Sequence, residues 1–368
     1  MQKLTNLLFK KQNMKRKNLI AKRRVKKNFL SIKDSKIKKL YKNFEESVSQ
    51  NIKKENFALA VSGGADSLCL SYFANQYCKK FKNKMHVLIV NHNLRRESYL
   101  EALKVKKILF KKKIVSKILV WKGKVPKSNI QGNARNLRYQ LLTDYCSRKK
   151  IKYLITAHHK DDQIENFYIR LLRGSGVTGL SSMSEIINYD KDIKIFRPFL
   201  HVKKSELQRV TLNYFGTYIK DPSNENKKFL RVRIRQFRKD MEKEGFDDSK
   251  IIKTIDNLLS AKKAIDFYKN KALYKHVTFL SKDNCVINTK IFSEESKEII
   301  FKSFSDILSL ISGTYYPPRS AKVLNLINRI KKIKYNKSTL GGCVIEKKED
   351  FISISKEEKP RVPISVVK

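Results

Sequence analysis

The chain has 368 residues and a formal net charge of +48, from 82 Lys and Arg against 34 Asp and Glu. Its length predicts two or three compact units, and its charge favours a polyanionic partner such as nucleic acid, although abundant Lys, Ile and Asn also fit a coding bias. Its five cysteines include no C-x-x-C pair, which argues against a disulfide framework and against a zinc or iron–sulfur site.

The chain opens on a basic segment that lacks the apolar core of a signal peptide. Residues 1–43 carry 16 Lys and Arg and one acidic residue, Asp34. We predict a basic N-terminal arm over residues 1–50, which either grips RNA, or is a solvated tail, or reflects a start codon placed before Met14. No apolar run in the chain approaches the ~20 residues of a membrane span, so we expect a cytoplasmic protein outside the membrane.

Beyond the arm, short apolar runs alternate with helical periodicity. Buried strands are predicted at Phe57–Val61, Val87–Val90, Ile118–Trp121 and Tyr153–Thr156. Helices are predicted between them at Leu68–Lys80, Leu100–Lys113 and Ala134–Lys149. The alternation is typical of an α/β fold with a doubly wound parallel sheet, and we assign residues 51–220 to it as a catalytic domain. Functional groups in such sheets lie at the carboxyl ends of the strands.

A glycine-rich turn joins the first predicted strand to the first predicted helix. Its glycines allow backbone N–H groups to approach a phosphate, its serines add hydroxyl donors, and the helix contributes the positive end of its dipole. A carboxylate at this position fits if Mg²⁺ lies between it and the phosphate oxygens. The chain has no G-x-x-x-x-G-K-[ST] motif, and the turn instead resembles the pyrophosphate loop of ATP pyrophosphatases. That resemblance implies ATP binding by Ser62, Gly63, Gly64, Ala65, Asp66 and Ser67.

The second half of the chain has a different pattern. From about Lys203 the strand pattern stops, and charged helical periodicity continues through Lys275. We predict a helical connector over residues 221–275 and a small α+β domain over residues 276–368. Short strands are predicted in that domain at Cys343–Glu346 and Phe351–Ser355.

Further motifs follow the glycine-rich turn in a fixed order. They are Val90–Arg95, Gly132–Tyr139, Thr156–Asn166, Arg170–Gly176, Asp221–Asn224 and Phe229–Arg235. The ordered set resembles the tRNA(Ile)-lysidine synthetases over about residues 55–240 and, more weakly, as far as Leu340–Cys343. The resemblance implies an adenine nucleotide α-hydrolase-like fold and a C-terminal domain that binds tRNA.

The same resemblance implies a two-step reaction. ATP adenylates the C2 oxygen of the wobble cytidine in a tRNA(Ile) with a CAU anticodon, and free L-lysine then displaces AMP to give lysidine. Pyrophosphate leaves in the first step. Asp66 would hold Mg²⁺, and Arg135 or Arg138 would supply positive charge around the α-phosphate.

A cluster of ionisable residues is predicted at the fourth strand. If Asp161 opens a helix, Asp162 and Glu165 share a face that points to where the strand delivers His158. The cluster has three possible roles, which are to hold a second cation, to bind the lysine ammonium group, or to accept a proton from it. Two adjacent acids without a cysteine partner argue against zinc.

Four arginines are candidates for tRNA contact. They are Arg173, Arg231, Arg233 and Arg235. The last three either alternate along a strand or sweep around a helix, and Val232 stands between them where the family usually has Asn. The stretch Gly174–Gly179 is either a mobile loop over the substrate or a plain helix end and turn.

Two other functions compete with lysidine formation. A tRNA cytidine thiolase of the same fold shares the loop but needs cysteine pairs, so it would require Cys69, Cys78 or Cys146 to meet in space. A non-enzymatic RNA-binding protein would use the charge alone and would leave Asp66 and the ionisable cluster without a role. The sequence leaves the oligomeric state open.

Overall fold

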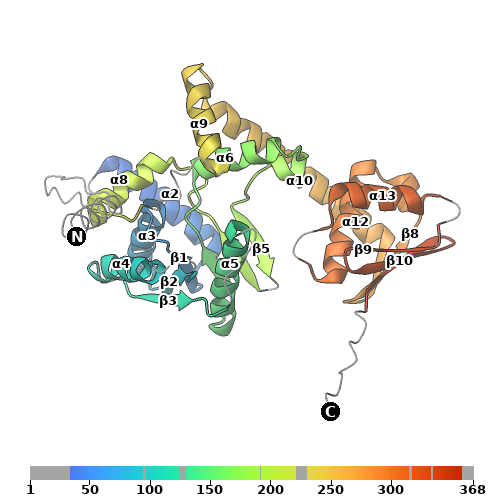
Figure 1. The fold of residues 1–368 in the computed structure, drawn as a ribbon, viewed down its shortest axis with the longest axis horizontal. Helices are drawn as coiled ribbons and strands as arrows, with labels where there is room; N and C mark the ends of the chain where they lie inside the picture. Colours follow the sequence, from blue (N-terminus) through green and yellow to red (C-terminus); the bar gives the residue numbers. More distant parts are fainter. Residues whose placement is uncertain are drawn as a thin grey trace, which may run out of the picture. The chain divides into compact units, whose positions relative to one another are not determined.

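The computed structural model describes residues 34–93, 97–123, 130–190, 192–220, 230–314, 317–332 and 335–358. They form two compact units, the first ending at Asp256 and the second beginning at Asn257, and each contains a β-sheet (Figure 1). The boundary falls inside helix α10 (Asp248–His276), so the predicted connector is divided between the units. Among the residues described, no helix is both long enough and apolar enough to cross a membrane.

The sheet of the first unit has six strands in the order β3-β2-β1-β4-β6-β5. They are β1 (Phe57–Ala60), β2 (Met85–Asn91), β3 (Ser116–Val120), β4 (Tyr153–Ile155), β5 (Ile186–Asp190) and β6 (Ile193–Phe196). Neighbouring strands are parallel except β5, which is antiparallel to β6. This confirms the predicted doubly wound parallel sheet. The order changes direction at β1, between β2 and β4, and ligands of such sheets bind at this switch point.

Helices cover both faces of this sheet (Figure 1). The helices of this unit before α10 are α2 (Ser35–Ile52), α3 (Ala65–Phe81), α4 (Ser98–Phe110), α5 (Ile130–Arg148), α6 (Lys160–Leu171), α7 (Val177–Leu180), α8 (Lys204–Phe215) and α9 (Leu230–Lys243), of which α9 packs on α6 and not on the sheet. Successive residues of β1 point to opposite faces. Phe57 and Leu59 lie in a core with α2, α3, α4 and α8, and Ala58 lies in a second core with α5.

Helix α2 corrects the expectation of an arm over residues 1–50. Its residues at helical spacing, Ile37, Leu40, Phe44, Val48 and Ile52, are buried in the core. The Phe44 ring lies 5.6 Å from the rings of both Phe73 and Phe199. Residues 35–50 are therefore part of the folded unit, because their apolar stripe outweighs the lysines on the opposite face. Residues 1–33 lie outside the described part.

The second unit is a small α+β body. Its strands are β7 (Val277–Ser281), β8 (Asn284–Asn288), β9 (Lys337–Leu340), β10 (Cys343–Lys348) and β11 (Phe351–Lys356), in the antiparallel order β7-β8-β11-β10-β9. Its helices after α10 are α11 (Ile291–Glu294), α12 (Lys297–Ser312) and α13 (Ser320–Ile330). Phe304 and Ile307 of α12 pack in one core with Ile345 and Ile352 of the sheet. This confirms the predicted C-terminal α+β fold.

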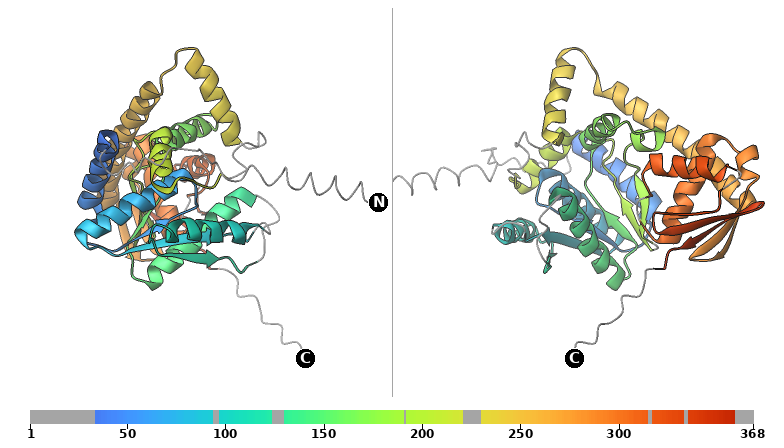
Figure 2. Two further views of the ribbon diagram at one scale, coloured as in Figure 1. Left: turned by 90° about the vertical axis from the view of Figure 1, so that its left-hand side faces the viewer. Right: turned by 45° about the vertical axis from the view of Figure 1, so that its right-hand side comes forward.

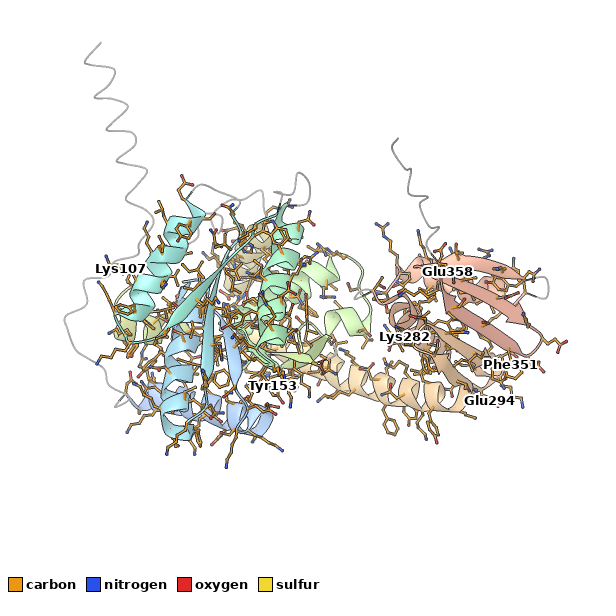
Figure 3. All side chains as sticks on the ribbon, turned by 90° about the horizontal axis from the view of Figure 1, so that it is seen from below. Lys107, Tyr153, Lys282, Glu294, Phe351 and Glu358 are labelled. Carbon is orange, nitrogen blue, oxygen red and sulfur yellow. The ribbon has the colours of Figure 1, made fainter. Side chains whose placement is uncertain are left out.

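Basic side chains stand on the outer surface of both units (Figure 3). Figure 3 labels Lys107 of α4 and Lys282 in the turn after β7, and both are exposed. The excess positive charge therefore does not belong to one unit alone.

Candidate active site

The glycine-rich turn lies between β1 and α3, at the carboxyl edge of the sheet. The Ser67 hydroxyl holds this turn together through three hydrogen bonds. The N–H groups of Ser62 and Gly63 both donate to Oγ at 3.2 Å, and Oγ donates to the Gly64 carbonyl at 3.0 Å. Gly63 has a φ of +88°, and a Cβ there would lie 2.4 Å from Cγ2 of Val105. Glycine is required at this position because the backbone is left-handed and α4 packs directly behind it.

The first turn of α3 is open toward a ligand. Gly64 is its N-cap, and no side chain caps the free N–H groups of that turn. Two residues from later in the chain hold the carbonyls of the turn. The Ile219 N–H donates to the Gly63 carbonyl at 2.9 Å, and the Thr211 hydroxyl of α8 donates to the Ala65 carbonyl at 2.6 Å. Free N–H groups at a helix N-terminus form an anion site, which suits the phosphates of ATP.

Asp66, in the first turn of α3, faces His159, the residue that precedes α6. Nε2 of His159 lies 3.5 Å from Oδ2 of Asp66 and 3.5 Å from Oδ2 of Asp162. The other Asp66 oxygen, Oδ1, is buried and has no hydrogen-bond partner among the residues described. Burying a carboxylate oxygen without a partner is costly, and a cation would remove that cost. The geometry therefore fits Asp66 as a ligand of Mg²⁺.

His159 also begins helix α6. The Asp162 N–H points to Nδ1 of His159 at 3.4 Å, and the His159 N–H donates to Oδ2 of Asp162 at 3.1 Å. Burial opposes protonation of the His159 ring, but its hydrogen bond to Asp66 and the charges of Asp162 and Asp161 together raise its pKa. The sequence pattern pointed to His158 and not to His159. The signal for His159 was its position at a helix start, two residues before Asp161 and three before Asp162.

The structure separates the predicted cluster of His158, Asp162 and Glu165. Nδ1 of His158 lies 2.8 Å from the Thr156 hydroxyl, and Asp162 contacts His159. Glu165 is 2% exposed and accepts from Nε of Arg235 at 2.5 Å. Asp162 and Glu165 do lie on one helix, as expected, but each has its own partner.

Arg231, Arg233 and Arg235 lie on helix α9, not on a strand. Arg231 and Arg235 are four residues apart and share a face, whereas Arg233 lies away from that face. Arg231 and Arg233 are both exposed, and Arg235 is half-buried beside the buried Ile234. Arg231 is nevertheless close enough to His158 for its charge to lower the pKa of that ring.

Helix α9 carries a further arginine that the sequence pattern did not single out. Arg238, one turn after Arg235, donates to Asp161 of α6 at 2.7 Å and to Asp248, the first residue of α10, at 2.9 Å. Burial alone would lower the pKa of Arg238, but its hydrogen bonds to Asp248 and Asp161 outweigh burial and raise that pKa. Figure 2 shows a bend between α9 and α10, and Arg238 of α9 binds Asp248 at the start of α10, across that bend.

A group of cationic side chains gathers around His158. Burial and four neighbouring arginines hold the pKa of His158 well below its usual range, so the ring is neutral at neutral pH. The four are Arg197, Arg135, Arg138 and Arg231. They come from the end of β6, from α5 and from α9, so residues far apart in sequence supply positive charge to one edge of the sheet.

His92, at the end of β2, lies near the same group of cationic side chains. Burial and the nearby Arg138 lower the pKa of His92 to about 4. Burial also lowers the pKa of Arg138 itself, with Arg135 and Arg231 adding to the effect. Two arginines of α5 lie over the Tyr139 ring, with Cζ of Arg135 at 5.1 Å and Cζ of Arg138 at 5.7 Å from its centroid. Both predicted arginines, 135 and 138, therefore belong to this cationic group.

Arg173 lies outside these contacts. It is exposed in the turn after α6, where the Gly174 N–H donates to the Leu171 carbonyl at 2.9 Å and the Ser175 N–H donates to the Arg170 carbonyl at 3.1 Å. Gly174 has a φ of +66°. These are the features of a helix end closed by glycine, so the geometry favours the plain turn over the mobile loop.

Comparison with known proteins identifies the family of this chain. A family model described as a PP-loop domain matches residues 30–239. The chain is 34% identical over 308 residues to the tRNA(Ile)-lysidine synthase of Orientia tsutsugamushi (strain Boryong), which covers 82% of this chain and 69% of that protein. It is 35% identical over 314 residues to the tRNA(Ile)-lysidine synthase of Wolbachia pipientis wMel, and the alignment covers 84% of this chain and 72% of that protein. The chain belongs to the tRNA(Ile)-lysidine synthase family. It is therefore an ATP-dependent ligase.

A solved structure supports the fold alone. The U34-tRNA thiolase NcsA from Methanococcus maripaludis, with its [4Fe-4S] cluster, aligns with a TM-score of 0.54 at 20% identity, covering 62% of this chain and 81% of that one. In this member of the lysidine synthase family all five cysteines are free. Cys69 and Cys78 pack on one face of the sheet and Cys146 on the other, so these three do not meet.

Asp66 offers a buried, unpartnered oxygen to a metal ion among the residues described. Within the described ranges, no three His, Cys, Asp or Glu side chains come together as a ready-made metal site. A cation at Asp66 would therefore need phosphate oxygens or water to complete its coordination, which is how Mg²⁺ usually binds beside nucleotides.

Proposed function

We propose that this chain uses ATP to join free L-lysine to C2 of the wobble cytidine of a tRNA(Ile) with a CAU anticodon, through an adenylated tRNA intermediate, and that it releases AMP and pyrophosphate. One observation carries the proposal. The anion-binding turn with Asp66 and the arginine-surrounded His158 lie at the carboxyl ends of the neighbouring strands β1 and β4.

In the first step, the cytosine C2 oxygen attacks the α-phosphorus of ATP. The new bond joins C2–O to phosphorus, the bond between the α-phosphorus and the bridging oxygen breaks, and pyrophosphate takes the electron pair. The N–H groups of the turn bind the departing phosphates, and Arg135 and Arg138 balance charge that develops on the transferred phosphate. Mg²⁺, held by Asp66, would supply further positive charge to the phosphate oxygens.

In the second step, the lysine ε-amine attacks C2. The new C2–N bond forms, the C2–O bond breaks, and AMP leaves with the electron pair. The attacking amine must be neutral and must lose a proton, while free lysine is mostly protonated near pH 7. His158 is the proposed hydrogen-bond acceptor for the attacking amine, because its lowered pKa keeps the ring neutral, and solvent takes the proton that the amine loses. The surrounding arginines also disfavour the ammonium form of a lysine bound beside them.

The predicted acids have different proposed roles in this scheme. Glu165 is committed to Arg235 and so positions α9 on α6. Asp162 holds His159, which in turn faces Asp66. Arg231, an exposed residue of α9 whose charge lowers the pKa of His158, is the proposed contact for the substrate phosphate or the anticodon. The C-terminal unit is proposed to bind the body of the tRNA.

The test is direct. Purified protein, ATP, Mg²⁺ and radiolabelled lysine should transfer label to a CAU-anticodon tRNA(Ile), and α-labelled ATP should appear as AMP. A transcript with uridine at the wobble position is the matched control, because it lacks the cytidine amidine system and should accept no lysine. Labelled ADP, or equal labelling of the control, would contradict the proposal. The His158→Ala variant should accumulate adenylated tRNA, and loss of adenylation itself would move His158 to the first step.

A further inference from the structure

Helix α10 carries a row of exposed aromatic side chains in the second unit. Phe267, Tyr268 and Tyr274 are 60%, 57% and 94% exposed. Single exposed apolar residues are ordinary, but Phe267, Lys271 and Tyr274 recur at helical spacing and so share one face of α10. Figure 3 shows side chains of α10 projecting freely from the helix. The proposed active site uses none of these residues.

The aromatic row borders a hollow in the surface. An open cavity of about 560 Å³ is lined by Phe267, Tyr268, Asn270, Lys271, Tyr274 and Lys275 of α10 and by one acid, Glu295, which follows α11. The Phe267 and Tyr268 rings meet edge to face with centroids 5.3 Å apart. Flat rings beside an open hollow can receive another planar group.

The charges that α10 brings to the hollow are positive. Nζ of Lys271 lies 6.0 Å above the centre of the Phe267 ring, and Lys271 forms no ion pair with any residue described. Lys275, in contrast, pairs with Glu294 at 2.6 Å. Lysine is depleted at the centre of protein–protein interfaces, whereas aromatic rings interleaved with lysine are typical of sites for unpaired nucleotides.

We infer that this face of α10 is a stacking platform for the unpaired 3′-terminal bases of the tRNA, with Phe267 and Tyr274 stacking on bases and Lys271 neutralising a phosphate. The inference rests on the proposed function, which makes a tRNA the substrate. The bases of a tRNA's elbow loops pair with one another, and the anticodon is the part that reacts. The 3′ end is an unpaired stretch that the reaction does not use, just as the platform lies outside the proposed active site.

Binding measurements on the full chain test this inference. Phe267→Ala and Tyr274→Ala should each raise the Kd for tRNA at least about fivefold, since stacking contributes about 1–3 kcal/mol per base. The slope of log K against log salt should not change for these two variants. Lys271→Ala should instead make that slope shallower by about 0.7, because one phosphate is no longer neutralised.

Two controls separate stacking from general damage. Tyr274→Phe keeps the ring and should bind normally, and Tyr99→Ala removes an exposed ring of α4 in the first unit and should have no effect. A tRNA that lacks its unpaired 3′ nucleotides should bind wild type and the two alanine variants equally. An unchanged Kd in a variant with wild-type thermal stability would overturn the inference, as would an equal loss with the shortened tRNA.

The binding experiment and the lysine-transfer experiment can fail separately. Wild-type protein that binds tRNA through the platform but transfers no lysine would contradict the proposed function alone. Wild-type lysine transfer with platform variants that bind normally would contradict the platform alone.

Discussion

Oδ2 of Asp66 and Nε2 of His159 approach to 3.5 Å, which joins the start of α3 to the start of α6 across the carboxyl edge of the sheet. The contact leaves Oδ1 of Asp66 as the oxygen without a partner among the residues described. His159 therefore fixes the orientation of the carboxylate that faces the nucleotide site.

Asp66→Asn should keep the affinity for tRNA and abolish adenylation, because a neutral amide is a much poorer ligand for Mg²⁺. His159→Ala should leave the carboxylate present but free to rotate, so the Mg²⁺ concentration needed for half-maximal ATP binding should rise while tRNA binding stays normal. Calorimetric ATP titration at several Mg²⁺ concentrations measures both effects. Wild-type AMP formation by Asp66→Asn would refute the metal role.

Gly63→Ala should impair both folding and ATP binding. The new Cβ would need a φ of +88° and would meet Val105 at 2.4 Å, and each problem costs about 1–3 kcal/mol. Adding Val105→Ala should relieve the clash but not the backbone strain, so the double variant should recover only part of the lost stability. Urea denaturation measures the recovery, and full recovery would show that the φ angle is unimportant.

Glu165→Gln should lower the free energy of unfolding by about 3 kcal/mol, because it leaves the charge of Arg235 without its buried partner. Glu46→Gln is the matched control, since Glu46 forms an exposed pair with Lys42 at 3.7 Å. That change should alter stability by less than about 0.5 kcal/mol. Equal effects of the two changes in urea denaturation would argue against an anchoring role for Glu165.

His92 should make the protein less stable as the pH falls. Its pKa is about 4 in the folded protein and about 6.5 in an unfolded chain, so the unfolded state binds more protons between these values. The stability that His92 contributes is present above pH ~6.5 and is lost as the pH falls toward 4. The loss should be on the order of 1 kcal/mol, allowing for solvent screening at this partly exposed ring.

Comparing His92→Gln with wild type by thermal melting from pH 7 to pH 4 isolates this contribution, because other titrating groups cancel in the difference. His201→Gln, at an exposed histidine, is the control and should follow the wild-type curve. A wild-type slope in His92→Gln would mean that His92 is not the responsible group.

Removal of residues 1–33 should reduce the slope of log K against log salt for tRNA binding by about 0.7–0.9 for each phosphate that the segment neutralises in the intact protein. The rate at saturating tRNA should not change. Removal of residues 1–43 should also destabilise the fold, because it deletes Ile37 and Leu40 from the core. An unchanged salt slope in the shorter truncation would identify the segment as a solvated tail.

Much of the first unit could be predicted because its signals are local. The apolar runs indicated β1 to β4, and the glycine-rich turn required only its own residues. The packing of helix α2 into the core was missed because its apolar stripe is embedded in lysines. The strands β5 and β6 were missed because Ile186–Asp190 is short and polar in part. Strand pairing at a sheet edge is decided by tertiary contacts, which a single sequence does not display.

The site was harder to predict than the fold. His158 and His159 are adjacent, and only the direction of the chain after β4 decides which ring turns toward Asp66. Arg231 and Arg235 could be separated from Arg233 only once α9 was known to be a helix. The pairing of Glu165 with Arg235 joins residues 70 positions apart, so no local pattern could indicate it.

The hydrogen bonds behind the glycine-rich turn also tie it to a distant part of the chain. The carbonyls of Gly63 and Ala65 accept from the Ile219 N–H and the Thr211 hydroxyl. Thr211 lies 146 positions along the chain from the carbonyl that it holds. Substitution of Thr211 should therefore change the shape of the turn without altering any residue of the turn itself.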